Sequence, residues 1–188
     1  MIAATERMTP DGWLDGIRRV ESPNCDDRPA DTEVSLLIVH SISLPPGEYG
    51  GDAIERFFTN RLDPGAHPYF QEIAGMRVSA HFLVRRDGEL VQFVPTLKRA
   101  WHAGVSSWRG RSACNDFSVG VELEGTDDSV FDEAQYRSLE QLVGRLRPAL
   151  PLRDIAAHSD VAPGRKTDPG PGFDWPRLLS DLGKTLRT

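Results

Sequence analysis

The sequence predicts an α/β fold: one domain with a central mixed β-sheet flanked by helices. An apolar run typical of a buried strand occupies residues 34–39, and apolar residues alternate strictly through 117–123. Leucines at helical spacing follow in the second half of the chain. Strands that alternate with helices form a sheet that helices cover. The length of 188 residues suits one domain, 1–188, with its core at about 34–183.

Two of the expected strands end at histidines. Residues 34–39 lead directly into His40, and the short apolar run 155–157 leads into His158. Side chains at such positions lie on a rigid scaffold next to loops, where functional groups are common.

A hairpin and a two-faced strand are expected between these strands. Segments 78–86 and 90–94 flank an Asp87-Gly88 pair, which is typical of a hairpin turn. Alternate residues of 117–123 point to opposite faces. One face therefore carries Phe117, Val119, Val121 and Leu123, and the other carries Ser118, Gly120, Glu122 and Glu124.

Three helices are expected to cover the sheet. Ser129 and Asp132 resemble a capping box that begins one helix, and Pro148 ends it. Asp52 and Asp174 can each cap a further helix. The apolar stripes of these two helices are Ile54, Phe57 and Phe58, and Leu178, Leu179 and Leu182.

Composition limits the partners and the location. A net charge of −6 argues against nucleic acid. Residues 77–111 nevertheless hold seven basic side chains against two acidic ones, which suits either a small anionic ligand or a solvated face. The sequence has no run of about 20 apolar residues and no signal-peptide pattern, so we expect a cytoplasmic protein without a membrane partner. Two cysteines, Cys25 and Cys114, are too few for a disulfide scaffold.

The candidate metal ligands are His40, His158 and Asp168. Three protein ligands leave the fourth position of a tetrahedral zinc open, as in catalytic sites. Non-haem iron enzymes also use two histidines and one carboxylate. Asp168 follows His158 by ten positions in a Pro-Gly-rich loop, which is also ordinary turn chemistry.

Many ordered motifs give the chain a family resemblance between about residues 35 and 175. They are Val39-His40-Ser41-Ile42-Ser43-Leu44-Pro45-Pro46-Gly47, His67-Pro68-Tyr69-Phe70, Ser79-Ala80-His81-Phe82, Arg99-Ala100-Trp101-His102-Ala103-Gly104-Val105-Ser106, Cys114-Asn115-Asp116-Phe117-Ser118, Glu122-Leu123-Glu124-Gly125-Thr126-Asp127 and Arg165-Lys166-Thr167-Asp168-Pro169-Gly170-Pro171. The chain thus resembles the AmpD family of cytosolic zinc amidases, which is related to phage T7 lysozyme and to peptidoglycan recognition proteins. The resemblance implies a zinc cleft along one face of the sheet and favours zinc over iron.

The resemblance also implies catalytic roles. Glu122 matches the family's catalytic glutamate, which moves a proton between water and the leaving amine, whereas Glu124 on the same face is the competing candidate. Lys166 matches a lysine that stabilises the oxyanion, and Tyr69 matches a tyrosine near the metal. Residues 47–76, with many turn signals and one short helix, are expected to form a mobile cover over the cleft.

Substrate contacts are expected from Trp101, for sugar stacking, and from Asn115, Arg77 and Arg111, for the stem peptide. His67 and His102 are expected at most to line the cleft, and His81 to be a hydrogen-bonded strand residue. The family carries asparagine where this chain has Ser41 and arginine where it has Ala113. Both positions would touch substrate.

The implied activity is zinc-dependent hydrolysis of the amide between 1,6-anhydro-N-acetylmuramic acid and L-alanine in muropeptides. The implied role is peptidoglycan recycling, with control of β-lactamase induction, by a monomeric enzyme on a small-molecule substrate. The alternatives are a non-catalytic muropeptide-binding module, which would typically lack a zinc ligand, and an amidase of intact cell wall.

Overall fold

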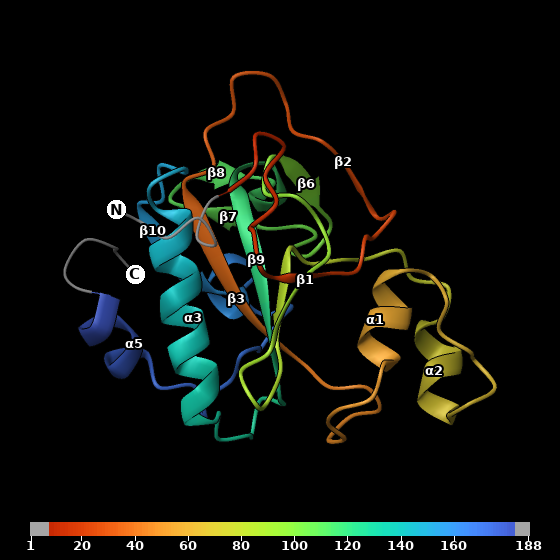
Figure 1. The fold of residues 1–188 in the computed structure, drawn as a ribbon. Helices are drawn as coiled ribbons and strands as arrows, with labels where there is room; N and C mark the ends of the chain where they lie inside the picture. The colour runs from red at the N-terminus through yellow and green to blue at the C-terminus, as the bar shows by residue number, and fades with distance from the viewer. Residues whose placement is uncertain (1–7, 183–188) are drawn as a thin grey trace.

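A mixed sheet forms the centre of the protein, as predicted, in a computed structural model that describes residues 8–182 (Figure 1). Its six strands lie in the order β1-β5-β4-β9-β3-β10. Strand β4 pairs antiparallel with β5, and the other neighbours are parallel. The strands are β1 (Arg18–Arg19), β3 (Leu36–Ile42), β4 (Phe82–Val84), β5 (Leu90–Gln92), β9 (Ser118–Glu124) and β10 (Asp154–Ala157).

Smaller elements that the sequence did not predict surround the sheet. Strand β2 (Cys25–Asp27) pairs with β6 (Lys98–Ala100), and β7 (Ser107–Trp108) pairs with β8 (Arg111–Ser112). The 3₁₀ turn η2 (Cys114–Phe117) leads directly into β9. These strands are only two or three residues long, too short for a periodic pattern.

Helix α3 (Glu133–Leu146) lies across one face of the sheet, with α5 (Trp175–Leu182) beside it (Figure 1). The predicted capping box is three residues too early, because Asp132 forms the box with Gln135. The predicted cap of α5 is confirmed, since Asp174 accepts a hydrogen bond from the Arg177 amide at 3.0 Å. The side chain of Leu182 lies outside the described residues.

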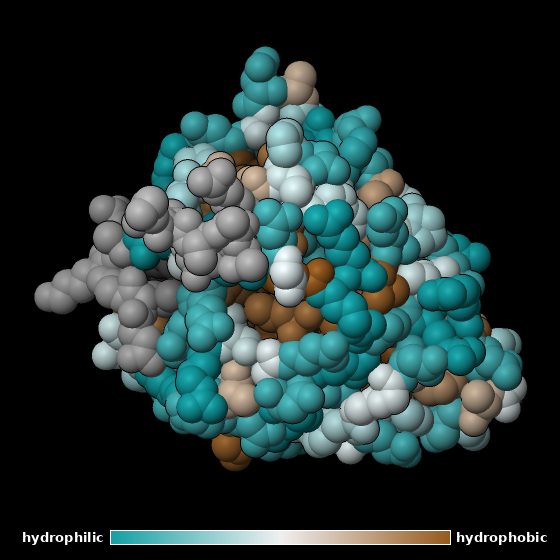
Figure 2. All heavy atoms as spheres, in the orientation of Figure 1, coloured by the Kyte–Doolittle hydropathy of each residue, from teal (hydrophilic) through white to brown (hydrophobic). Residues whose placement is uncertain are grey.

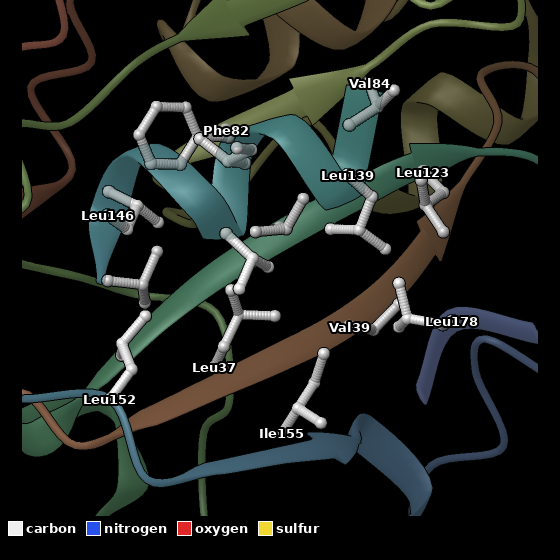
Figure 3. Packing of buried hydrophobic residues seen from close by; sticks show 14 of the residues in the cluster. Leu37, Val39, Phe82, Val84, Leu123, Leu139, Leu146, Leu152, Ile155 and Leu178 are labelled. Carbon is white, nitrogen blue, oxygen red and sulfur yellow. The ribbon is translucent and has the colours of Figure 1, made fainter. Parts of the chain in front are cut away.

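The main core fills the space between the sheet and these two helices. The predicted alternation of β9 is confirmed, because Val119, Val121 and Leu123 all point into this core. Figure 3 shows Leu139 and Leu146 of α3 above Leu37 and Val39 of β3 and Ile155 of β10, with Leu123 of β9 beside Leu139. Figure 2 shows apolar side chains in the middle of one face of the molecule, over the strands between α3 and α1, with hydrophilic side chains around them.

Two short helices lie to one side of the sheet, away from α3 (Figure 1). Helix α1 (Ala53–Phe58) is the one predicted from Asp52, although the Asp52 side chain makes no capping hydrogen bond. Helix α2 (Pro68–Ile73) was missed, and the His67 side chain caps it by accepting from the Tyr69 amide. Within residues 8–182, no helix is long and apolar enough to cross a membrane.

A second core cluster holds α1 and α2 to the protein. It includes Phe57, Phe58, Phe70 and Ile73 from the helices, packed with Phe93 next to the sheet. The segment predicted to cover the cleft is therefore packed by its own apolar residues.

Candidate functional site

Strand pairing brings the two candidate histidine ligands together. In the parallel pair of β3 and β10, Val39 lies opposite Ala157, so His40 and His158 follow side by side at the same edge. His158 is the first residue of the short helix α4 (His158–Val161). Their Nδ1 atoms lie 2.9 Å apart. Asp168 Oδ2 lies 3.0 Å from His158 Nδ1 and 3.3 Å from His40 Nδ1.

The three donor atoms fit a divalent metal ion. They lie within 4.8 Å of one another. Burial lowers the pKa of His40 from 6.5 to about 4, so its imidazole is neutral at neutral pH. Burial by itself would raise the pKa of Asp168, but its close contacts with His158 and His40 outweigh burial and lower the pKa below its usual range. Two imidazole nitrogens with one ionised carboxylate oxygen form a donor set of catalytic zinc sites.

The far ring nitrogens of both histidines also have partners. His158 Nε2 donates to the Ala103 carbonyl at 3.2 Å, and His40 Nε2 lies 2.9 Å from His102 Nδ1. Such outer contacts orient metal-binding histidines. The sequence assigned His102 no chemistry, and no spacing signal could have linked residues 62 positions apart.

Glu122 lies next to the donor set because β3 and β9 are in register, with His40 opposite Glu122. Among the described residues, its Oε2 is one of the few buried side-chain atoms without a hydrogen-bond partner. Burial, with a smaller contribution from the charge of Asp168, raises the pKa of Glu122 well above 4.5. A carboxyl group with a raised pKa in a cavity is a candidate proton carrier.

These groups open into a cavity of 490 Å³. Apolar side chains of the α1–α2 segment form one wall, and the loop that carries Asp168 forms another. The cavity is lined by His40, Ser41, Ile42, Ser43, Leu44, Pro46, Phe57, Phe58, Tyr69, Ile73, Met76, Val78, Ser79, Trp101, His102, Glu122, Gly125, Asp127, His158, Arg165, Lys166, Thr167 and Asp168.

The structure brings some of the predicted site residues into this cavity. Besides the donor set and Glu122, they are Lys166, Tyr69, Trp101 and Ser41. The sequence did not single out Asp127 or Arg165, which also line it. Arg165 donates to the carbonyls of Ala103 and Val105 and so fastens the loop that carries Lys166 to the loop around residue 104.

Three predicted substrate contacts are not among the lining residues. The exposed Arg77 donates to the carbonyl of its neighbour Met76. The guanidinium of Arg111 lies 3.9 Å from the centre of the Phe117 ring. Asn115 Oδ1 accepts from the backbone amides of two residues, His102 at 3.2 Å and Ala103 at 2.8 Å.

Gly120 makes room for a histidine ring. The imidazole of His102 occupies the space that a side chain at residue 120 would fill. A Cβ atom at residue 120 would lie 2.5 Å from His102 Cγ. Competing Glu124 is also occupied, because it accepts from the amides of Gly50 and Arg86.

Comparisons with known proteins agree with this geometry. Residues 30–171 match the N-acetylmuramoyl-L-alanine amidase family. The 1,6-anhydro-N-acetylmuramyl-L-alanine amidase AmpD of Salmonella typhimurium is 58% identical over 174 residues, which are 91% of this chain and 93% of that protein. A crystal structure of an AmpD selenomethionine derivative superposes with a TM-score of 0.90 at 54% identity, covering 94% of this chain and 99% of that one.

A more distant solved structure contains a ligand. It is a complex of the N-acetylmuramyl-L-alanine amidase AmiD from Escherichia coli with the substrate anhydro-N-acetylmuramic acid-L-Ala-D-γ-Glu-L-Lys. The TM-score is 0.58 at 26% identity, with coverage of 93% of this chain and 65% of that one.

The buried histidines predict how the stability of the metal-free protein depends on pH. Burial lowers the pKa of His40 to about 4, that of His81 to about 3 and that of His102 well below 6.5. Between about pH 6.5 and 4.5 the unfolded chain therefore binds more protons at these sites than the folded one. Glu122 acts in the opposite sense, because its raised pKa keeps a proton on the folded state.

The three histidines together outweigh Glu122. The free energy of unfolding should therefore fall as the pH is lowered from about 6.5 to 4.5, by at most roughly 3 kcal/mol per pH unit. Urea unfolding of metal-free protein at about pH 7.5, 6 and 5 measures it. A constant or rising stability toward pH 5 would contradict neutral burial of these imidazoles.

Proposed function

Because the chain belongs to the N-acetylmuramoyl-L-alanine amidase family, we propose that it hydrolyses the amide between the lactyl group of 1,6-anhydro-N-acetylmuramic acid and L-alanine in muropeptides. This activity is that of relatives 48–58% identical over most of the chain. The biological role is peptidoglycan recycling, which removes the fragments that induce β-lactamase. A cytoplasmic site of action and a monomeric enzyme are parts of the proposal.

One observation carries the mechanistic part: the unpartnered Oε2 of Glu122 lies buried beside two histidines and an aspartate whose donor atoms converge. In this proposal His40, His158 and Asp168 hold zinc. Zinc at such a site supplies a Lewis acid that activates water and polarises the scissile carbonyl.

Glu122 then handles the protons. Its carboxylate takes a proton from the attacking water as the oxygen adds to the carbonyl carbon, and it returns that proton to the amide nitrogen as the C–N bond breaks. The products are the lactyl carboxylate and the free amine of L-alanine. A raised pKa suits a group that must accept and donate a proton in the same turnover.

Lys166 and Tyr69 line the same cavity. We assign the Lys166 ammonium to the negative charge that develops on the carbonyl oxygen, and the Tyr69 phenol to a hydrogen bond with that oxygen. Trp101 lies half-buried at the cavity, where its ring can stack on the apolar face of the sugar. Ser41 is assigned to substrate, and Asp127 and Arg165 are further polar groups that can contact it.

The proposed activity predicts that purified zinc-loaded protein converts an anhydromuropeptide into free stem peptide and anhydro sugar, which mass spectrometry detects. The anhydro sugar is a rigid bicycle, so stacking on Trp101 should favour it over the reducing-end sugar. Trp101→Ala should therefore reduce the ratio of kcat/KM for the anhydro substrate to kcat/KM for the reducing-end substrate. Equal values in the wild type would disprove the preference, and an unchanged ratio in the variant would remove Trp101 as its cause.

The proposed metal site predicts zinc content. Wild-type protein should bind one zinc ion per chain, and His40→Ala, His158→Ala and Asp168→Ala should each bind much less, because each removes one of three ligands. Elemental analysis after dialysis against a fixed free zinc concentration measures this. His67→Ala, outside the donor set, is the control. Full zinc content in all three ligand variants would refute the site.

Glu122 and Lys166 should act on turnover and not on metal content. Glu122→Ala should retain zinc and lose roughly 10²–10⁴-fold in kcat, the usual range for a general acid–base group. Lys166→Ala should lose about 10²–10³-fold, as for an oxyanion contact. Glu124→Gln is the matched control on the same strand face. A near wild-type rate for Glu122→Ala would show that Glu122 is not the proton carrier.

A further inference from the structure

A line of hydrogen bonds runs from His40 away from the cavity. His40 Nε2 lies 2.9 Å from His102 Nδ1, and His102 Nε2 lies 3.3 Å from Ser118 Oγ. Ser118 Oγ in turn lies 2.6 Å from the Cys114 carbonyl. Ser118 and His40 are buried, and His102 is partly buried.

The carbonyl at the end of this line fixes the direction of every bond in it. The Cys114 oxygen can only accept, so the single hydroxyl hydrogen of Ser118 points to it. Ser118 Oγ must then accept from His102 Nε2–H. Neutral His102 keeps a lone pair on Nδ1, which accepts from His40 Nε2–H. The lone pair of His40 is thereby left on Nδ1, the atom that faces His158 and Asp168.

The segment 102–103, which contains His102, also orients His158. The Ala103 carbonyl accepts from His158 Nε2, so His158 Nδ1 carries the lone pair toward Asp168. Asn115 Oδ1 holds this segment in place by accepting from the amides of residues 102 and 103. His40 and His158 are thus both oriented from one two-residue segment.

Gly120 makes the space for this arrangement. A Cβ there would lie 2.5 Å from both Cγ and Nδ1 of His102. Any side chain at residue 120 would displace the ring that holds His40.

We propose that His102 is a positioning residue that fixes the tautomer and orientation of His40 for metal binding, with Ser118 setting the tautomer of His102. Asn115 has the corresponding supporting role for both histidines, in place of a direct contact with substrate. The inference rests on the proposed metal site but not on catalytic turnover.

The first test reads the tautomers directly. Long-range ¹H–¹⁵N NMR of the zinc-loaded protein at neutral pH should place the ring hydrogen on Nε2 in His40, His102 and His158. Ser118→Ala should leave the fold intact and, without zinc, allow His102 to populate the other tautomer. A hydrogen on Nδ1 of His102 in the wild type would overturn the proposal.

The second test measures zinc affinity by competition with a chelator. His102→Leu removes the acceptor for His40 Nε2–H and should weaken zinc binding by roughly 10–100-fold, the usual effect of losing such a partner. His102→Asn places an amide oxygen near the Nδ1 position and should recover most of that loss. The visible spectrum of the cobalt-substituted protein should shift in the leucine variant and return toward wild type in the asparagine variant.

His81→Leu is the matched control for packing. His81 is fully buried and also contacts β9, accepting from the Gly120 amide, but it makes no hydrogen bond to a metal ligand among the described residues. Its loss should lower the melting temperature and leave the zinc affinity unchanged. Equal losses of zinc affinity in His81→Leu and His102→Leu, or no recovery in His102→Asn, would show that His102 acts only through packing.

The outcomes separate the two proposals. A wild-type protein that binds no zinc would refute the metal site itself. A wild type and a folded His102→Leu protein that bind zinc equally well would refute only the positioning role.

Discussion

The site depends on the in-register parallel pairing of β3 with β9 on one side and with β10 on the other. This pairing sets His40 beside Glu122 and, one residue beyond the strand, beside His158. Side chains alternate between the two faces of a strand. A slip of β3 by one residue would therefore point His40 into the core under α3 and an apolar side chain into the cavity. The packing of Val39 and Leu37 beneath α3 therefore holds the chemistry on the opposite face.

Burial then gives the site its electrostatic character. The same exclusion of water keeps His40 neutral and raises the pKa of the Glu122 carboxyl. Asp168 stays ionised because its close contacts with the two histidines offset its own burial. A neutral imidazole at His40, a negative oxygen and a nearby proton carrier thus arise from one environment. In solvent these groups would titrate near their ordinary values.

Sequence patterns predicted the parts of the molecule that are set by local periodicity. The alternation in β9 and the apolar stripe of α3 were readable because each repeats over two or more turns or pleats. Motif resemblance predicted the donor set, which the fold brings together. Helix α2 escaped because it has six residues and begins at a proline that also reads as a loop.

The outer contacts could not be predicted, because they join residues that are distant in the chain through geometry alone. His102 meets His40 across 62 positions, and Asn115 acts on a segment 12 residues away by accepting backbone hydrogens. Arg77 and Arg111 were placed in the site from local charge, and charge says nothing about the direction in which a side chain points. Both lie outside the set of residues that line the cavity.

The Ala103 carbonyl has a consequence for how such a protein can diversify. This main-chain oxygen holds His158 and also accepts from Arg165, so neither contact requires a particular side chain at residue 103. Two residues further on, Val105 is 87% exposed while its carbonyl also binds Arg165. Selection can therefore change the exposed side chain of Val105 without altering the backbone path that orients His158. Surface side chains can thus vary while the position of His158 stays the same.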